Sequence, residues 1–169
     1  MRKAAALVVL LAFNGCGYGL VGRGNVLDPS LRTINIPTFE NRTTRVEIDQ
    51  RFTQAVADEF VSRGRLQLVS DPKAANAVLR GVINSFSLNP VGFDQGRATQ
   101  YEISVTASIE LIDRRNNEDK VIWKNDQYRF VENYRVDPMT DSFDQEGRAI
   151  REIAVRFAQS LVANLLEGF

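Results

Sequence analysis

The stretch from Tyr101 to Leu111 alternates strictly between apolar and polar side chains. Its apolar residues are Tyr101, Ile103, Val105, Ala107, Ile109 and Leu111, and its polar residues are Glu102, Ser104, Thr106, Ser108 and Glu110. Because successive side chains of a β-strand point to opposite faces, this pattern predicts a strand with one face on the core and the other in water. Helices that cover such a sheet must therefore gather on one side of it.

Two segments have the apolar spacing of amphipathic helices. The first, Val46 to Arg63, carries Ile48, Phe52, Ala55, Val56 and Phe60 at helical intervals, and Gly64 follows as a C-terminal cap. The second, Ser142 to Leu166, carries Ile150, Ile153, Ala154, Phe157, Leu161 and Leu165. Packing against a core accounts for this second stripe better than a cofactor-binding role does.

The remaining apolar segments predict shorter strands and their connections. Strands are expected at Leu31–Phe39, Arg65–Ser70, Ala77–Leu88 and Lys120–Val131. The strand–helix–strand order in the first half favours parallel pairing, and Asn125 with Asp126 favours a β-bulge. Asn89–Gly96 and Glu132–Asp141 are expected to be loops. The predicted fold is α+β: a two-layer sandwich with two amphipathic helices packed on one face of a four- to five-stranded mixed sheet.

The N-terminus has the layout of a bacterial export signal. Arg2 and Lys3 precede an apolar run that ends at Phe13, which is too short to span a membrane, and the only cysteine follows at position 16. This arrangement resembles a lipobox, which implies lipid attachment at Cys16. We therefore predict a signal peptide at residues 1–15, a lipid-anchored tether at 16–30 and a single domain at 31–169. The alternative is an ordinary secretory signal with an incidental cysteine.

Composition limits the chemistry. The chain has no histidine, which removes the commonest general base and metal ligand, and the lone cysteine is not available if it is acylated. We therefore expect no catalytic residues, no metal and no cofactor. Lysine and arginine number 21, as do aspartate and glutamate, so no basic field favours nucleic acid. Carboxylate pairs remain as an alternative, drawn from Asp94, Glu102, Glu110, Asp113, Glu118 and Asp119.

Four segments together resemble one known family. They are Cys16–Leu20 (CGYGL), Ile34–Thr43 (INIPTFENRT), Ala74–Gly81 (AANAVLRG) and Tyr101–Ile103 (YEI). In order and spacing they are similar to the LptE family of lipopolysaccharide-assembly lipoproteins. The resemblance implies an outer-membrane lipoprotein, lipid-anchored on the periplasmic side, that plugs and helps to assemble the LptD β-barrel and binds lipopolysaccharide during its transport to the outer leaflet.

The resemblance also directs attention to particular residues. A lipopolysaccharide site needs arginine or lysine for the anionic groups and apolar surface for the acyl chains. Phe93 and Arg97 in the hairpin, and Arg135 before the last helix, are the candidates for this contact. Tyr18 and Tyr134 are the candidates for the interface with the barrel. Ordinary solvated loop charges are the alternative for both arginines.

Two other functions remain open at this stage. The same small scaffold suits an envelope lipoprotein that binds a different periplasmic or outer-membrane protein as a non-enzymatic adaptor. A hydrolase with paired carboxylates would instead need a cleft around Asp94, Glu102 or Glu110.

Overall fold

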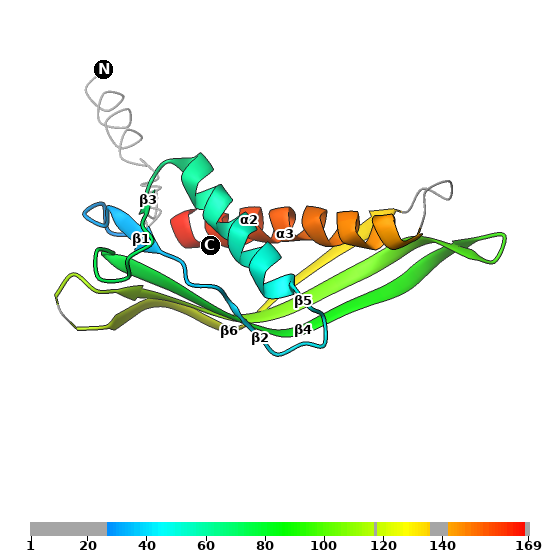
Figure 1. The fold of residues 1–169 in the computed structure, drawn as a ribbon, viewed down its shortest axis with the longest axis horizontal. Helices are drawn as coiled ribbons and strands as arrows, with labels where there is room; N and C mark the ends of the chain where they lie inside the picture. Colours follow the sequence, from blue (N-terminus) through cyan, green and yellow to red (C-terminus); the bar gives the residue numbers. More distant parts are fainter. Residues whose placement is uncertain (1–26, 117, 136–141, 168–169) are drawn as a thin grey trace, which may run out of the picture.

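The computed structural model describes residues 27–116, 118–135 and 142–167, and gives only the backbone of residues 142–146 and 167. The elements in chain order are β1 (Thr33–Asn35), β2 (Glu40–Asn41), α2 (Ile48–Arg63), β3 (Gln67–Leu68), β4 (Ala77–Asp94), β5 (Arg97–Asp113), β6 (Lys120–Arg135) and α3 (Ser142–Glu167). This order confirms the predicted α+β class (Figure 1). None of the described helices combines the length and apolar character needed to cross a membrane.

The sheet is mixed, with strand order β3-β1-β4-β5-β6 and β2 beside β4. Strands β1 and β3, joined through α2, pair in parallel, which confirms the prediction for this connection. The three long strands β4, β5 and β6 form an antiparallel meander. The sheet has six strands rather than four to five, because the short β2 lies in a stretch that the sequence predicted as a polar loop.

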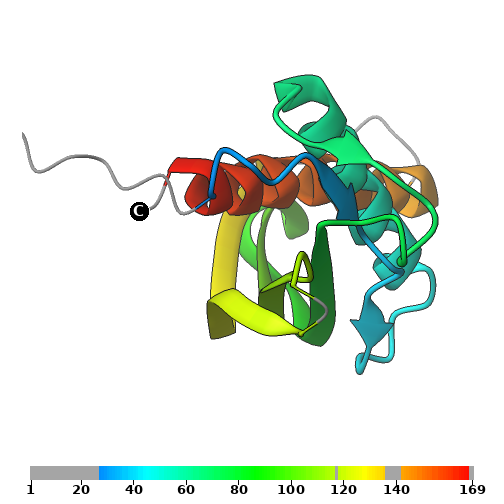
Figure 2. The same ribbon diagram turned by 90° about the vertical axis from the view of Figure 1, so that its left-hand side faces the viewer.

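Both helices pack on the same face of the sheet, as predicted (Figure 2). Helix α2 ends at Gly64, whose positive φ of 63° is the left-handed conformation of a glycine cap. Its apolar stripe, with Phe52, Val56 and Phe60, is fully buried against the rest of the core. The opposite face of β5 is lined by the polar residues of the alternating stretch, so the two-layer arrangement follows from that pattern.

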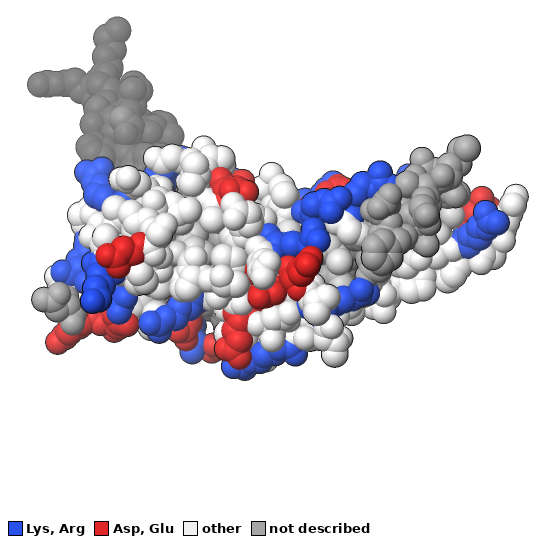
Figure 3. Space-filling model, in the orientation of Figure 1, with Lys and Arg blue, Asp and Glu red and all other residues white. Residues whose placement is uncertain are grey.

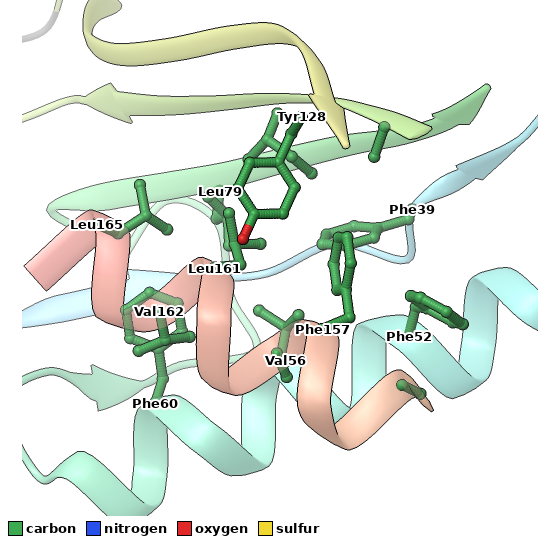
Figure 4. Close-up of a cluster of buried hydrophobic side chains, with 14 of the residues drawn as sticks. Phe39, Phe52, Val56, Phe60, Leu79, Tyr128, Phe157, Leu161, Val162 and Leu165 are labelled. Carbon is green, nitrogen blue, oxygen red and sulfur yellow. The ribbon is translucent and has the colours of Figure 1, made fainter. Parts of the chain in front are cut away.

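An aromatic cluster joins the two layers (Figure 4). Phe157 of α3 packs edge-on against Phe52 of α2 at 5.0 Å and against Tyr128 and Phe130 of β6 at 5.5 and 6.0 Å between ring centroids. The Tyr128 hydroxyl lies 2.7 Å from the Ser160 hydroxyl, which satisfies a polar atom that burial would otherwise leave without a partner. This cluster holds the helix pair to the centre of the sheet.

The β-bulge predicted in the last strand is present. Ala107 pairs with Tyr128 while Ile109 pairs with Asn125, so two residues of β6, Asp126 and Gln127, stand opposite Ser108 alone. The Ser108 hydroxyl donates to the Asp126 carbonyl at 2.9 Å and accepts from the Asn84 side chain at 2.8 Å. The polar face of the sheet therefore supplies the hydrogen bonds that the bulge removes from the ladder.

The predicted loop at residues 89–96 is wrong. Strand β4 continues to Asp94, and only Gln95 and Gly96, at φ 46° and 78°, form the turn, which is the geometry of a two-residue type I′ hairpin. Pro90 is tolerated because β4 beyond Ile83 has β5 as its only described partner, so the proline occupies an edge. The prediction failed because proline and glycine at a strand edge have the same sequence signal as a loop.

Candidate functional site

The free end of the β4–β5 hairpin, residues 89–101, together with residues 132–135 of β6, is called the distal arm below. Figure 1 shows this hairpin projecting past the ends of both helices. Here β4 and β5 pair from Asn89 and Glu102 to the turn, and β6 ends alongside β5 at Arg135. The distal arm therefore carries the three predicted lipopolysaccharide contacts and one of the two predicted interface tyrosines on one structural unit.

Phe93 and Arg97 lie together at the tip of the arm. Phe93 is 65% exposed, and among the described residues it is the only phenylalanine with a largely exposed side chain. It pairs with Ala98, and Asp94 pairs with Arg97 next to the turn. Consecutive pairs of a ladder point to opposite faces, so the Phe93 ring and the Arg97 guanidinium flank the tip from its two sides. A ligand that extends around the tip can place an apolar chain against the ring and an anionic group against the guanidinium. Asp94 weakens the binding of an anion at this tip, because its carboxylate lies across the ladder from Arg97.

Arg135 and Tyr134 belong to strand β6, not to the loop in which the sequence placed them. Arg135 is exposed and pairs with Gln100, three residues along β5 from Arg97. At strand spacing this separates the two arginines by about 10 Å plus one strand width. Tyr134 pairs with Tyr101 and packs partly against the core. Because the distance between the two arginines is a backbone separation and arginine side chains are long, one anionic ligand can reach both arginines.

Two predicted site residues have no structural description. Cys16 and Tyr18 lie outside the described residues. The description begins at Leu27, which is buried with only 2% exposure, so the chain is already packed on the domain a few residues before β1.

The carboxylates considered for hydrolysis do not form a pair. Glu102 and Glu110 lie eight residues apart on β5, or roughly 25 Å at strand spacing, whereas paired catalytic carboxylates stand roughly 5–10 Å apart. Asp94 is at the turn, further still from Glu110. Glu110 instead forms an ion pair with Lys124 at 3.0 Å, and the hydrogen bonds that Lys124 donates to Glu110 and to Asp126 raise the pKa of that lysine. The spacing of Asp94, Glu102 and Glu110 therefore does not match a catalytic carboxylate pair.

A network of charges at the opposite end was not predicted. The Arg115 guanidinium donates to Asp113 at the end of β5 and to Asp28 before β1, with Nε and Nη1 distances of 3.0 Å. Hydrogen bonds from the Ser30 backbone and hydroxyl, and then from Arg115, lower the pKa of Asp28 to about 2. The contact joins positions 87 residues apart, so no local pattern in the sequence indicates it.

Figure 3 shows charged side chains at both ends of the long axis, and also near the middle of this face and along its lower edge. At the free end of the hairpin, basic and acidic atoms lie next to each other. Among the described residues, no group of three histidine, cysteine, aspartate or glutamate side chains is placed to hold a metal ion. The distal arm is therefore a candidate binding surface that acts through charge and apolar contact.

Comparisons with solved structures show how widely this fold occurs. Protein XCC0632 from Xanthomonas campestris matches with a TM-score of 0.57 and 10% identity, covering 82% of this chain and 88% of that chain. PelC from Paraburkholderia phytofirmans, solved as a dodecamer, matches with a TM-score of 0.53 and 16% identity, covering 83% and 92%. At these identities the likeness shows the fold alone. A search of curated proteins found no match.

A family model decides the identity of the chain. The model named LptE and described as lipopolysaccharide-assembly matches residues 31–165, which includes every strand and nearly all of α3. The match contains the segments INIPTFENRT, AANAVLRG and YEI on which the resemblance was based. This chain therefore belongs to the LptE family of lipopolysaccharide-assembly proteins.

Proposed function

We propose that this protein is a non-enzymatic outer-membrane lipoprotein that occupies the lumen of an LptD-type β-barrel, helps to assemble it, and binds lipopolysaccharide through the distal arm. The match to the LptE family over residues 31–165 carries this proposal. The proposed anchor is an acylated Cys16, after removal of residues 1–15, with residues 16–30 as the tether on the periplasmic side.

The dimensions of the molecule support a tip-outward orientation in the barrel. Strand β4 has 18 residues, which at strand spacing gives a length of roughly 55–60 Å, compared with about 30 Å for the hydrocarbon core of a bilayer. The stretch from Cys16 to Leu27 can span at most about 40 Å. An anchor in the inner leaflet therefore permits the end that carries Leu27 to stay near the periplasm while the distal arm reaches across the membrane.

The outer face of the sheet suits contact with a wet barrel wall. Ser104, Thr106 and Ser108 lie in a row on this face and are each partly exposed. Their hydroxyl groups both donate and accept hydrogen bonds, so they can pair with the polar lining that large barrels have inside. Tyr134 at the arm, and Tyr18 near the anchor, are the proposed aromatic contacts with the barrel.

Lipopolysaccharide binding is tested with the double variant Arg97→Glu/Arg135→Glu and with Phe93→Ala. Both should weaken binding of purified lipopolysaccharide, because the first reverses the charge that meets the anionic groups and the second removes the exposed ring. Arg129→Glu is the matched control, since Arg129 is an exposed cation on β6 below the arm. Unchanged affinity in the double variant would remove these residues from the site.

Barrel association is tested by extracting the tagged full chain in detergent and identifying its partners. The proposal requires a stoichiometric outer-membrane barrel that stays bound, and Tyr134→Phe should weaken that complex without disturbing the packing of the ring. Recovery of a different envelope protein at stoichiometric level would favour the adaptor function instead. Mass spectrometry of the N-terminal peptide tests acylation, because an unmodified Cys16 would exclude the lipid anchor.

A further inference from the structure

The end of the molecule opposite the distal arm contains a polar hollow, and we propose that it binds a phosphate group. The hollow has a volume of about 290 Å³ and is lined by Pro72, Lys73, Ala75, Arg114 and Asp119. It lies between the loop that leads into β4 and the turn that joins β5 to β6. The full length of β4, roughly 55–60 Å, separates it from Phe93 and Arg97, so it is distinct from the proposed lipopolysaccharide contact.

Positive charge exceeds negative charge at this hollow. Among the described residues that line it, only Asp119 is acidic, and its carboxylate is shared between Arg114 at 2.7 Å and Arg80 at 3.8 Å. Within the described residues, the Lys73 ammonium forms no ion pair or side-chain hydrogen bond. Two cations, Lys73 and Arg114, thus line the hollow with one carboxylate, which Arg80 also contacts from outside the lining. An anion that enters the hollow meets a net positive charge that the protein itself does not neutralise.

The walls of the hollow are held in place before any ligand binds. The Asp71 side chain accepts from the backbone N–H of Lys73 at 2.9 Å, which orders the turn that presents the lysine. The Arg114 backbone N–H donates to the Asn76 carbonyl at 2.8 Å and joins the two walls. The Thr33 hydroxyl accepts from the Asn76 N–H at 2.9 Å and ties the loop to β1. Such preorganisation lowers the entropy that binding must overcome.

The chemistry favours a tetrahedral oxyanion over a single carboxylate. Arg114 uses Nε for its ion pair with Asp119. The two terminal nitrogens of Arg114, Nη1 and Nη2, form no ion pair with a described carboxylate. A phosphate has enough oxygens to accept from these nitrogens and from the Lys73 ammonium at the same time. The inference stands on this geometry alone and does not depend on the proposed role of the distal arm.

Titration of the full chain in a neutral, phosphate-free detergent tests the proposal. Inorganic phosphate should shift the backbone amide signals of residues 73–76, 114 and 119, and calorimetry should give the affinity. Lys73→Gln/Arg114→Gln should weaken binding by about tenfold or more, because it removes both donors. Arg148→Gln, at an exposed position on α3, should leave the affinity unchanged. Amide shifts elsewhere, or an unchanged affinity in the double variant, would overturn the proposal.

Asp119→Asn sharpens the test. The amide oxygen still accepts from Arg114 but carries no charge, so phosphate should bind several-fold more tightly. Weaker or unchanged binding in this variant contradicts a site that holds its ligand by net positive charge. Lys73→Gln alone provides a variant with no native side-chain contact to lose, which separates loss of binding from loss of folding.

Soluble fragments then identify the source of the phosphate group. Glycerophosphoglycerol represents a phospholipid headgroup, and a phosphorylated glucosamine disaccharide represents the headgroup of lipopolysaccharide. Preference for either assigns the site to that lipid, and equal binding of both and of inorganic phosphate assigns it to the phosphate alone. Failure of all three to bind would overturn the proposal, while the distal-arm variants described above would be unaffected.

Discussion

Strands β4 and β5 each have two halves that differ in side-chain burial: one half lies beneath the helices and the other forms the distal arm. In the half beneath the helices, Leu79, Ile83, Ile109 and Leu111 have no exposed surface. In the distal arm, Val91 and Phe93 of the same ladder are 51% and 65% exposed. Continuous pairing therefore extends well beyond the part of the sheet that burial stabilises, and the extension is the part available for binding.

The reason for the difference is the geometry of the two kinds of element. A helix rises 1.5 Å per residue and a strand about 3.3 Å. Helix α2, with 16 residues, is about 24 Å long and α3, with 26 residues, is about 39 Å long, whereas β4 is roughly 55–60 Å long. The two helices pack against each other rather than end to end, so together they cover little more of the hairpin than the length of α3. The uncovered arm is a direct consequence of element lengths.

The largest expected difference between the two halves concerns their phenylalanines. Phe157→Ala should lower the free energy of unfolding by about 3–5 kcal/mol, because it empties the centre of the aromatic cluster, where the side chain has no exposed surface. Phe93→Ala, in the distal arm, should change it by no more than about 0.5 kcal/mol. Urea unfolding of both variants measures the contrast, and equal effects would mean that the arm is packed rather than projecting.

Gly81 provides a test of packing in the covered half. A Cβ atom at this position would lie 2.7 Å from the Phe39 ring, so Gly81→Ala should destabilise the fold by about 1–3 kcal/mol. Gly147 of α3 is the matched control, because its Cβ would meet only the flexible end of Arg151 at 3.6 Å. Gly147→Ala should be neutral or stabilise by up to about 1 kcal/mol. Thermal unfolding that ranks the two in the reverse order would contradict the close contact with Phe39.

Acid should affect the end that carries Arg115. The pKa of Asp28 is lowered from 3.8 to about 2, and that of Asp113 is lowered by its hydrogen bond with Arg115. A carboxyl with a lowered pKa stabilises the folded state above its unfolded pKa, and this contribution is lost as the pH falls toward the folded value. Unfolding measured from pH 5 to pH 2 should therefore show a smaller loss of stability in Arg115→Ala than in the native chain.

An acid sensitivity in Arg115→Ala as large as that of the native chain would assign the effect to other carboxyls. Part of the sensitivity should remain in any case, because hydrogen bonds from Ser30 are the largest cause of the shift at Asp28. Arg129→Ala on β6 is the control, and its acid dependence should match that of the native chain.

The smallest expected effect is at the turn of the distal arm. Gln95 and Gly96 both have positive φ, and asparagine is favoured over glutamine at the first position of a type I′ turn. Gln95→Asn should stabilise by about 0.5 kcal/mol. Amide exchange should slow at residues 92–99 and stay the same in the covered half of the strands. A uniform change along β4 would mean that the arm and the covered half open as one unit.

Much of the fold was accessible from periodicity. The alternation from Tyr101 to Leu111, the helical stripe that ends near Leu166 and the bulge at Asn125 and Asp126 all appear where they were predicted. Each of these features depends on residues close together in the chain, or on which face of a strand or helix is apolar. The loop predicted at Asn89–Gly96 failed because an unpaired strand edge accepts the residues that usually end a strand.

For the candidate sites too, the sequence predicted residue types, whereas the fold was needed to show which residues lie together. The sequence selected Phe93, Arg97 and Arg135 by residue type, but only the sheet register showed that Arg135 lies on a strand, three residues along the ladder from Arg97. The sequence did not predict a site at Lys73 and Arg114, because neither residue lies in a motif that distinguishes it from other surface cations. They become a candidate site only where a loop before β4 meets the turn after β5.

By itself, the sequence determined the class of fold, the one-sided packing of the helices and the family, because these depend on the order and spacing of apolar residues and on local motifs. The tertiary structure decided how far the hairpin projects, how Arg115 joins distant segments and which cations converge at the two ends. These features depend on register and on contacts between residues far apart in the chain, for which a linear pattern contains no signal.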